Sequence, residues 1–151
     1  TQPKAVYFID GSTDNPEKEI ERYKELLAEY PRDFQLLGLG TNGHIGANEP
    51  GTAFDAEMFL AQHTQSTIES TMKEYGITRE EAPTEMITLG FAEILDAEKV
   101  LLLVSGEHKA EATKELLEGE VTESNPASVL HNHDNSIVVI DEAATSLIDK
   151  N

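Results

Sequence analysis

The chain has 151 residues, enough for one domain with its own core, and its 38% hydrophobic and 26% charged residues are ordinary for a globular protein. A formal net charge of −18 argues against nucleic acid or an anionic membrane as a partner. The absence of cysteine excludes disulfides and thiolate metal sites, and fits a reducing, cytoplasmic location. We find neither a membrane-spanning apolar run nor a secretory leader in the sequence.

The first half of the chain alternates short apolar segments with helix patterns. Residues 5–9 (AVYFI) are expected to form a strand or an extended segment. The helix that follows has Asn15 as its cap and Pro16 at its first position. Residues 34–40 (FQLLGLG) are predicted to form a buried strand, and residues 64–76 a helix that stops at its terminal glycine.

The second half contains the clearest strand–turn–helix unit, residues 99–119, in which KVLLLV leads through Ser-Gly into a helix. Uninterrupted apolar strands separated by helices predict a parallel sheet covered on both faces, so we expect a single three-layer α/β domain over residues 1–151. The other elements predicted here are a short strand at 86–90, short helices at 91–97 and 125–133, a buried strand at 136–141, and the start of a last helix at 142–150.

Two loops leave the carboxyl ends of predicted strands, residues 38–52 and 105–109, and parallel α/β sheets bind ligands at such ends. The first loop is rich in glycine, which permits positive φ angles and close backbone approach to a ligand. It also holds His44 and Glu49 five residues apart, followed by Pro-Gly. This combination indicates a functional site but does not identify the reaction that it catalyses.

The segment LGLGTNGHIGANEPGT, residues 37–52, resembles the motif of the glucosamine-6-phosphate deaminase/isomerase family, and the likeness continues along essentially the whole chain. The resemblance implies a Rossmann-like fold and conversion of an amino-sugar 6-phosphate into a ketose 6-phosphate and ammonia. It implies a small-molecule partner, no cofactor and no metal, with a homo-oligomer among the assemblies known for such proteins.

The family likeness assigns roles to residues of the glycine-rich loop. His44 would be the acid/base for opening the pyranose ring, because an imidazole can take and return a proton near neutral pH. Glu49 and Asn42 would orient that imidazole, and Asn42 would act only through hydrogen bonds. Gly40 and Gly43 would bind substrate.

The phosphate of such a substrate needs cations. The resemblance places a phosphate-binding lysine at Lys109, in the first turn of a helix that follows a parallel strand, where backbone N–H groups also favour an anion. It places a second cation at Lys73. The family has arginine there, and a lysine cannot form the bidentate hydrogen bonds that arginine makes to phosphate oxygens.

Two family features are missing from the sequence: the Asp-Glu-Tyr motif that supplies the enolising base, and a Gly-Ser-Thr-Pro phosphate loop. The stretch Gly11-Ser12-Thr13 is too close to the glycine-rich loop to be that phosphate loop. The chain therefore resembles the carboxy-terminal part of the family domain without its first βαβ section. We expect strands that have lost a neighbour, exposed apolar surface, and an inactive or impaired enzyme.

Three alternatives remain open at this point. The chain could be a non-catalytic module for sugar-phosphate binding or assembly, it could act on galactosamine 6-phosphate, or, less in keeping with Asn48-Glu49-Pro50, it could be a 6-phosphogluconolactonase. The run His131-Asn132-His133-Asp134 resembles a metal-binding sequence. Two histidines two residues apart would diverge, so a helix end is the favoured interpretation.

Overall fold

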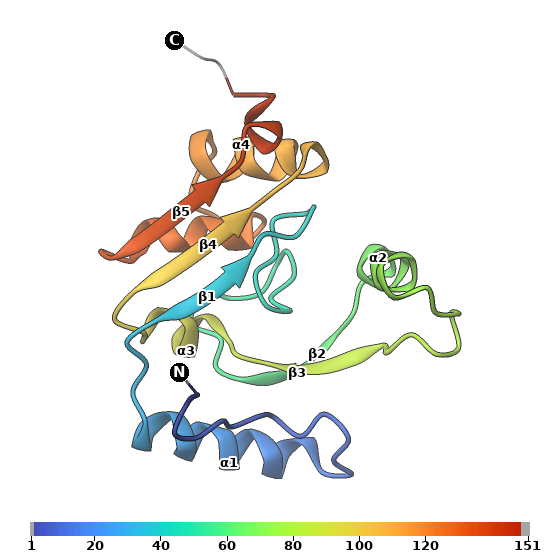
Figure 1. Ribbon diagram of the computed structural model, residues 1–151, viewed down its shortest axis with the longest axis vertical. Helices are drawn as coiled ribbons and strands as arrows, with labels where there is room; N and C mark the ends of the chain where they lie inside the picture. The colour runs from blue at the N-terminus through green and yellow to red at the C-terminus, as the bar shows by residue number, and fades with distance from the viewer. Residues whose placement is uncertain (1, 149–151) are drawn as a thin grey trace.

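The protein is described here as a computed structural model, in which residues 2–148 are placed. Its centre is a parallel three-stranded sheet in the order β1-β4-β5, which confirms the predicted parallel α/β architecture (Figure 1). The strands are β1 (Gln35–Gly38), β4 (Val100–Val104) and β5 (Ser136–Ile140). None of the helices in the described residues is long and apolar enough to cross a membrane.

The amino-terminal region agrees with its prediction, and the structure decides between the two forms expected for residues 5–9. Helix α1 (Pro16–Glu29) begins as expected, with the Asn15 side chain accepting a hydrogen bond from the Lys18 backbone N–H. Residues 5–9 form no strand and run as an extended segment beside α1 (Figure 1). This segment pairs with no sheet edge and instead meets α1, where the Phe8 carbonyl accepts a hydrogen bond from Arg22.

The βα unit of residues 99–119 forms as predicted, with a short 3₁₀ turn, η1 (Glu107–Lys109), between β4 and helix α4 (Ala110–Glu118). The segment predicted as a short helix at 125–133 is the 3₁₀ helix η2 (Pro126–Asn132). Of the last helix, predicted at 142–150, the described residues form the short turn η3 (Ala143–Thr145), and residues 149 and 150 lie outside them. The core lies between one sheet face and these elements, and its largest fully buried side chains include Phe91, Ile94, Leu102, Leu116 and Leu130.

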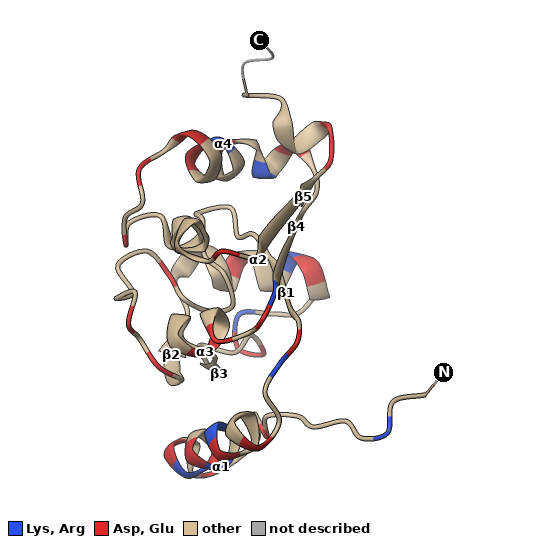
Figure 2. Cartoon of the chain, turned by 90° about the vertical axis from the view of Figure 1, so that its left-hand side faces the viewer, with Lys and Arg blue, Asp and Glu red and all other residues tan. Residues whose placement is uncertain are grey.

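The opposite face of the sheet is bare in the part of the chain that is described. Parallel register places Leu36, Leu101 and Ile137 side by side, and Leu103 beside Val139 in the next row. Four of these side chains are about half exposed: Leu36 (56%), Leu103 (45%), Ile137 (51%) and Val139 (51%). Figure 2 shows the sheet edge-on, with α3 and α4 on one side of it. The expected exposed apolar surface is therefore present, whereas the prediction that both faces of the sheet are covered is wrong for the described residues.

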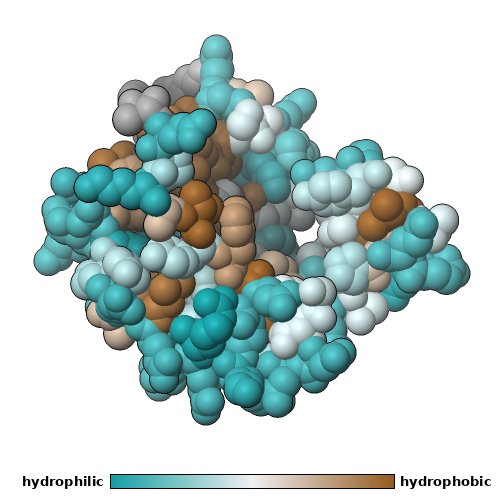
Figure 3. Space-filling model, turned by 60° about the horizontal axis from the view of Figure 1, so that its bottom comes forward, coloured by the Kyte–Doolittle hydropathy of each residue, from teal (hydrophilic) through white to brown (hydrophobic). Residues whose placement is uncertain are grey.

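A second feature is an antiparallel pair of strands, β2 (Phe59–Gln62) and β3 (Glu85–Thr88), that extends away from the sheet. Strand β3 overlaps the short strand predicted at 86–90, whereas β2 and the pairing were not predicted. The connection between them carries helix α2 (Gln65–Tyr75), which ends at Gly76 with φ of 66°, as predicted. The chain then returns to the core through α3 (Phe91–Leu95). Figure 1 shows the α2 region beside the main body, and the space-filling view of Figure 3 shows a hollow between them.

Candidate active site

The glycine-rich loop after β1 brings His44, Asn42 and Glu49 together, as the sequence predicts. His44 Nδ1 lies 2.7 Å from Asn42 Oδ1, and Asn42 Nδ2 donates to Glu49 Oε2 at 2.7 Å. The direct separation of His44 Nδ1 and Glu49 Oε2 is 3.7 Å, too long for a hydrogen bond. Asn42 thus bridges the imidazole and the carboxylate.

This bridge selects one tautomer of the imidazole. A carboxylate only accepts hydrogen bonds, so the Asn42 amide must turn its NH₂ group toward Glu49 and its oxygen toward His44. An oxygen acceptor requires a proton on His44 Nδ1. The other ring nitrogen, Nε2, is then left unprotonated and able to take a proton from a ligand.

Glu49 is held from a second direction by α2. Its Oε1 accepts hydrogen bonds from Thr67 Oγ1 at 2.5 Å and from Thr64 Oγ1 at 3.4 Å. Thr64 is also the cap of α2, where its hydroxyl accepts from the Thr67 backbone N–H. Sequence reasoning missed both threonines, and the only signal for them was the capping pattern, which does not reveal a contact with a residue 15 or more positions earlier.

Gly40 and Gly43 are glycine for different structural reasons. A β-carbon on Gly40 would lie within 3.0 Å of three atoms of the His44 ring, so glycine here makes room for the imidazole. Gly43 has a φ of +82° and packs against the Asn125 side chain. Its carbonyl accepts from the Ala127 backbone N–H, which ties the loop to η2.

Lys109 lies at the junction of η1 and α4, beyond the carboxyl end of β4. The preceding turn is fixed by Asp141 after β5, whose carboxylate accepts from Ser105 Oγ at 2.6 Å and from the Gly106 backbone N–H. These contacts keep the pKa of Asp141 below its usual value. Gly106 has a φ of +96°, a conformation that favours glycine.

His44 and Lys109 line the same cavity, of about 400 Å³, between the glycine-rich loop and α2. Gly40 also lines it, whereas Gly43 lies outside its wall. Lys73 is exposed in the last turn of α2 and is absent from this wall. Sequence reasoning missed several polar residues that α2 contributes instead: Thr67, Ser70, Thr71 and Glu74.

The electrostatics of the cavity favour a neutral imidazole. Burial lowers the pKa of His44 below its ordinary 6.5, the Glu49 carboxylate opposes this, and Lys109 and His63 lower the pKa further. Burial also lowers the pKa of Lys109, against the opposing effect of Glu74. His44 can therefore act as a base at neutral pH.

His131 and His133 make separate contacts with backbone carbonyls. His131 Nε2 lies 2.7 Å from the Leu116 carbonyl, and His133 Nε2 lies 2.9 Å from the Ala97 carbonyl. Residues 2–148 contain no group of three or more His, Cys, Asp or Glu side chains placed to hold a metal ion.

A parallel α/β sheet with helices packed on it defines a Rossmann-like domain, and here a histidine and a lysine lie beyond the carboxyl ends of its strands. The family described as glucosamine-6-phosphate isomerases/6-phosphogluconolactonase matches residues 1–139. Glucosamine-6-phosphate deaminases from Streptococcus uberis and Streptococcus pneumoniae are 44% and 46% identical to this chain over 97% of its length. The chain belongs to this family.

Solved structures agree with the fold. A monomeric glucosamine-6-phosphate deaminase superposes with a TM-score of 0.90 at 40% identity, over 93% of this chain and 58% of that one. A 6-phosphogluconolactonase from Trypanosoma brucei, 18% identical with a TM-score of 0.70, shares the fold. The chain spans 62% of the length of the two streptococcal relatives.

Proposed function

We propose that this chain carries the ring-opening and phosphate-binding part of a glucosamine-6-phosphate deaminase. The observation that carries the proposal is the hydrogen-bonded series His44–Asn42–Glu49, facing a cavity that Lys109 also lines. The deaminase relatives, at 44–46% identity, supply the substrate class.

In this proposal, His44 Nε2 takes the proton of the anomeric hydroxyl of a bound amino-sugar 6-phosphate. The C1–O5 bond then breaks, its electron pair goes to O5, and the imidazolium returns the proton to that oxygen. Asn42 and Glu49 stabilise the transient positive charge through the proton on Nδ1. Lys109 pairs with the phosphate and fixes the sugar's orientation.

Completion of the reaction requires a base that moves a proton between C2 and C1 of the open sugar. Glu74 is the carboxylate that the described cavity wall presents, and it lies on α2 with Lys109 within its electrostatic reach. Because the sequence lacks the Asp-Glu-Tyr motif that supplies this base in the family, we propose that the chain by itself opens the ring but isomerises poorly. The lactonase alternative has weaker support, since those neighbours share the fold at 18–24% identity.

Ring opening can be measured directly, without turnover. Exchange NMR of glucosamine 6-phosphate reports interconversion of its two anomers, and deuterium incorporation at C2 reports enolisation. We expect the chain to accelerate anomer exchange with little deuterium uptake or ammonia release. His44→Gln should abolish the acceleration, whereas His108→Gln, at an exposed histidine in η1, should not.

Two outcomes would contradict the proposal in different ways. Ammonia release at the rate of a full-length deaminase would show that isomerisation is intact in this chain. Unaccelerated anomer exchange, despite binding of glucosamine 6-phosphate in calorimetry, would favour a non-catalytic binding module. Galactosamine 6-phosphate in the same two assays tests selectivity at C4.

A further inference from the structure

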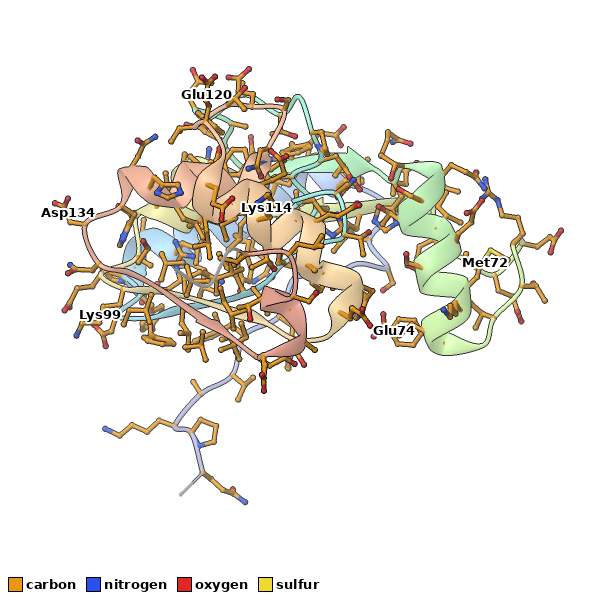
Figure 4. The ribbon with its side chains drawn as sticks, turned by 90° about the horizontal axis from the view of Figure 1, so that it is seen from above. Met72, Glu74, Lys99, Lys114, Glu120 and Asp134 are labelled. Carbon is orange, nitrogen blue, oxygen red and sulfur yellow. The ribbon has the colours of Figure 1, made fainter. Side chains whose placement is uncertain are left out.

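The end of the cavity that holds Lys109, the proposed phosphate-binding residue, also contains a carboxylate. Glu74 and Lys109 line the same cavity, one from the last turn of α2 and the other from the junction of η1 and α4. Figure 4 shows Glu74 on the side of α2 that faces the main body, whereas Met72 points to the opposite side. The two charges therefore belong to one cavity wall, to which α2 contributes Glu74 and the main body contributes Lys109.

The arrangement is electrically unusual for a site that receives a dianion. Lys109 is the cation in the described cavity wall, because Lys73 is exposed elsewhere on α2. Glu74 adds a negative charge to the same cavity wall, and Glu49 adds a further carboxylate beside His44. The chain as a whole carries a formal charge of −18, so the general field also repels an anion.

We propose that Glu74 is a specificity residue that weakens the preference of this cavity for a phosphate group. The inference rests on the proposed function, since it takes Lys109 as the phosphate partner. In consequence, the site discriminates only weakly between an amino-sugar 6-phosphate and the same amino sugar without phosphate. A phosphate that binds Lys109 must do so against the repulsion of Glu74.

The influence of Glu74 on Lys109 supports this assignment. The two residues line one cavity, and the Glu74 carboxylate acts to raise the pKa of the Lys109 ammonium against the larger effect of burial. Removal of a unit negative charge about 8 Å from a phosphate dianion in water should raise the affinity for the phosphate about fivefold. The effect must fall at high ionic strength, because salt screens charges that are open to solvent.

A charge series at this position gives the test. Inorganic phosphate, glucosamine 6-phosphate and glucosamine are titrated by calorimetry into the wild-type chain, Glu74→Gln and Glu74→Lys. We expect affinity for both phosphate ligands to rise about fivefold with each added unit of charge, and affinity for glucosamine to stay level or fall. Added salt, to 1 M, should remove most of the trend.

Glu69→Gln is the matched control, because it removes the same charge from the same helix. Glu69 bonds the Gln65 amide on α2 and is absent from the cavity wall. It should leave all three affinities unchanged. An equal gain from Glu69→Gln and Glu74→Gln would assign the effect to net charge and overturn the proposal.

A readout without ligand separates this inference from the proposed function. The pKa of the Lys109 ammonium, followed by NMR, should fall in Glu74→Gln and stay constant in Glu69→Gln. An unchanged pKa together with unchanged phosphate affinity overturns the role of Glu74, while the anomer-exchange test of His44 remains unaffected. Phosphate binding that is gained only in Glu74→Gln supports the role even if the wild-type chain binds no phosphate.

Discussion

Replacing Gly40 by alanine isolates the contact between the loop backbone and the His44 ring. Gly40 has no left-handed φ, so alanine meets no backbone strain there. The added methyl would, however, lie within 3.0 Å of three ring atoms. The imidazole must therefore move, and its contact with Asn42 Oδ1 is lost or lengthened.

The expected cost follows from the steric and hydrogen-bond changes together. Overpacking of a well-packed position costs about 1–3 kcal/mol, and loss of one hydrogen bond costs about 1 kcal/mol. Alanine also reduces the conformational entropy of the unfolded chain, which stabilises the folded protein by about 0.4–1 kcal/mol. The net destabilisation is then about 1–3.6 kcal/mol, and each kcal/mol lowers Tm by about 2–4 °C in a domain of this size.

Urea denaturation of four proteins gives the measurement: wild type, Gly40→Ala, His44→Ala and the double variant. Because His44→Ala removes the ring, Gly40→Ala should cost close to nothing in that background. Gly38→Ala serves as the control, since a β-carbon on Gly38 meets no atom within 4 Å. An equal loss from Gly40→Ala in both backgrounds would refute the steric reasoning.

Two further perturbations test other parts of the structure. Thr67→Val removes the hydrogen bond to Glu49 Oε1 and should lower the free energy of unfolding by about 1.5–3 kcal/mol. Ser70→Ala, on the same helix, should lower it little. Equal losses in urea denaturation would argue against a role for the Thr67 hydroxyl. Arg22 and the Asp10 N–H lower the pKa of Glu19 from 4.5 to about 2, so Glu19 contributes stability above pH 4.5 that is lost as pH falls toward 2. Glu19→Gln should reduce this loss in acid denaturation curves, and an unchanged curve would exclude Glu19 as its source.

The elements with strong local signals were predictable from the sequence. Asn15 and Pro16 define the start of α1, and a left-handed glycine at position 76 ends α2. The proximity of His44 and Glu49 was also predictable, because both lie in one short glycine-rich loop. The place of Asn42 beside them was expected from the family resemblance.

The parts that depend on distant contacts were not predictable in the same way. Strand β2 has four residues and exists through its pairing with β3, which begins more than twenty residues later. The arm formed by this pair places Thr67 on Glu49 and Glu74 in one cavity wall with Lys109, so α2 shapes the cavity through tertiary placement. Residues 5–9 have a strand-like composition but no partner edge in the described chain.

The bare sheet face has a consequence for how this protein behaves at high concentration. Its apolar rows favour contact between copies, while the charge of −18 keeps copies apart at low ionic strength. Acidic side chains are spread over the rest of the surface, and apolar groups are visible between hydrophilic ones (Figures 2 and 3). Concentrated salt weakens the charge repulsion between copies without weakening the apolar attraction. An oligomer that forms only in such buffers therefore indicates nonspecific association through the bare sheet face.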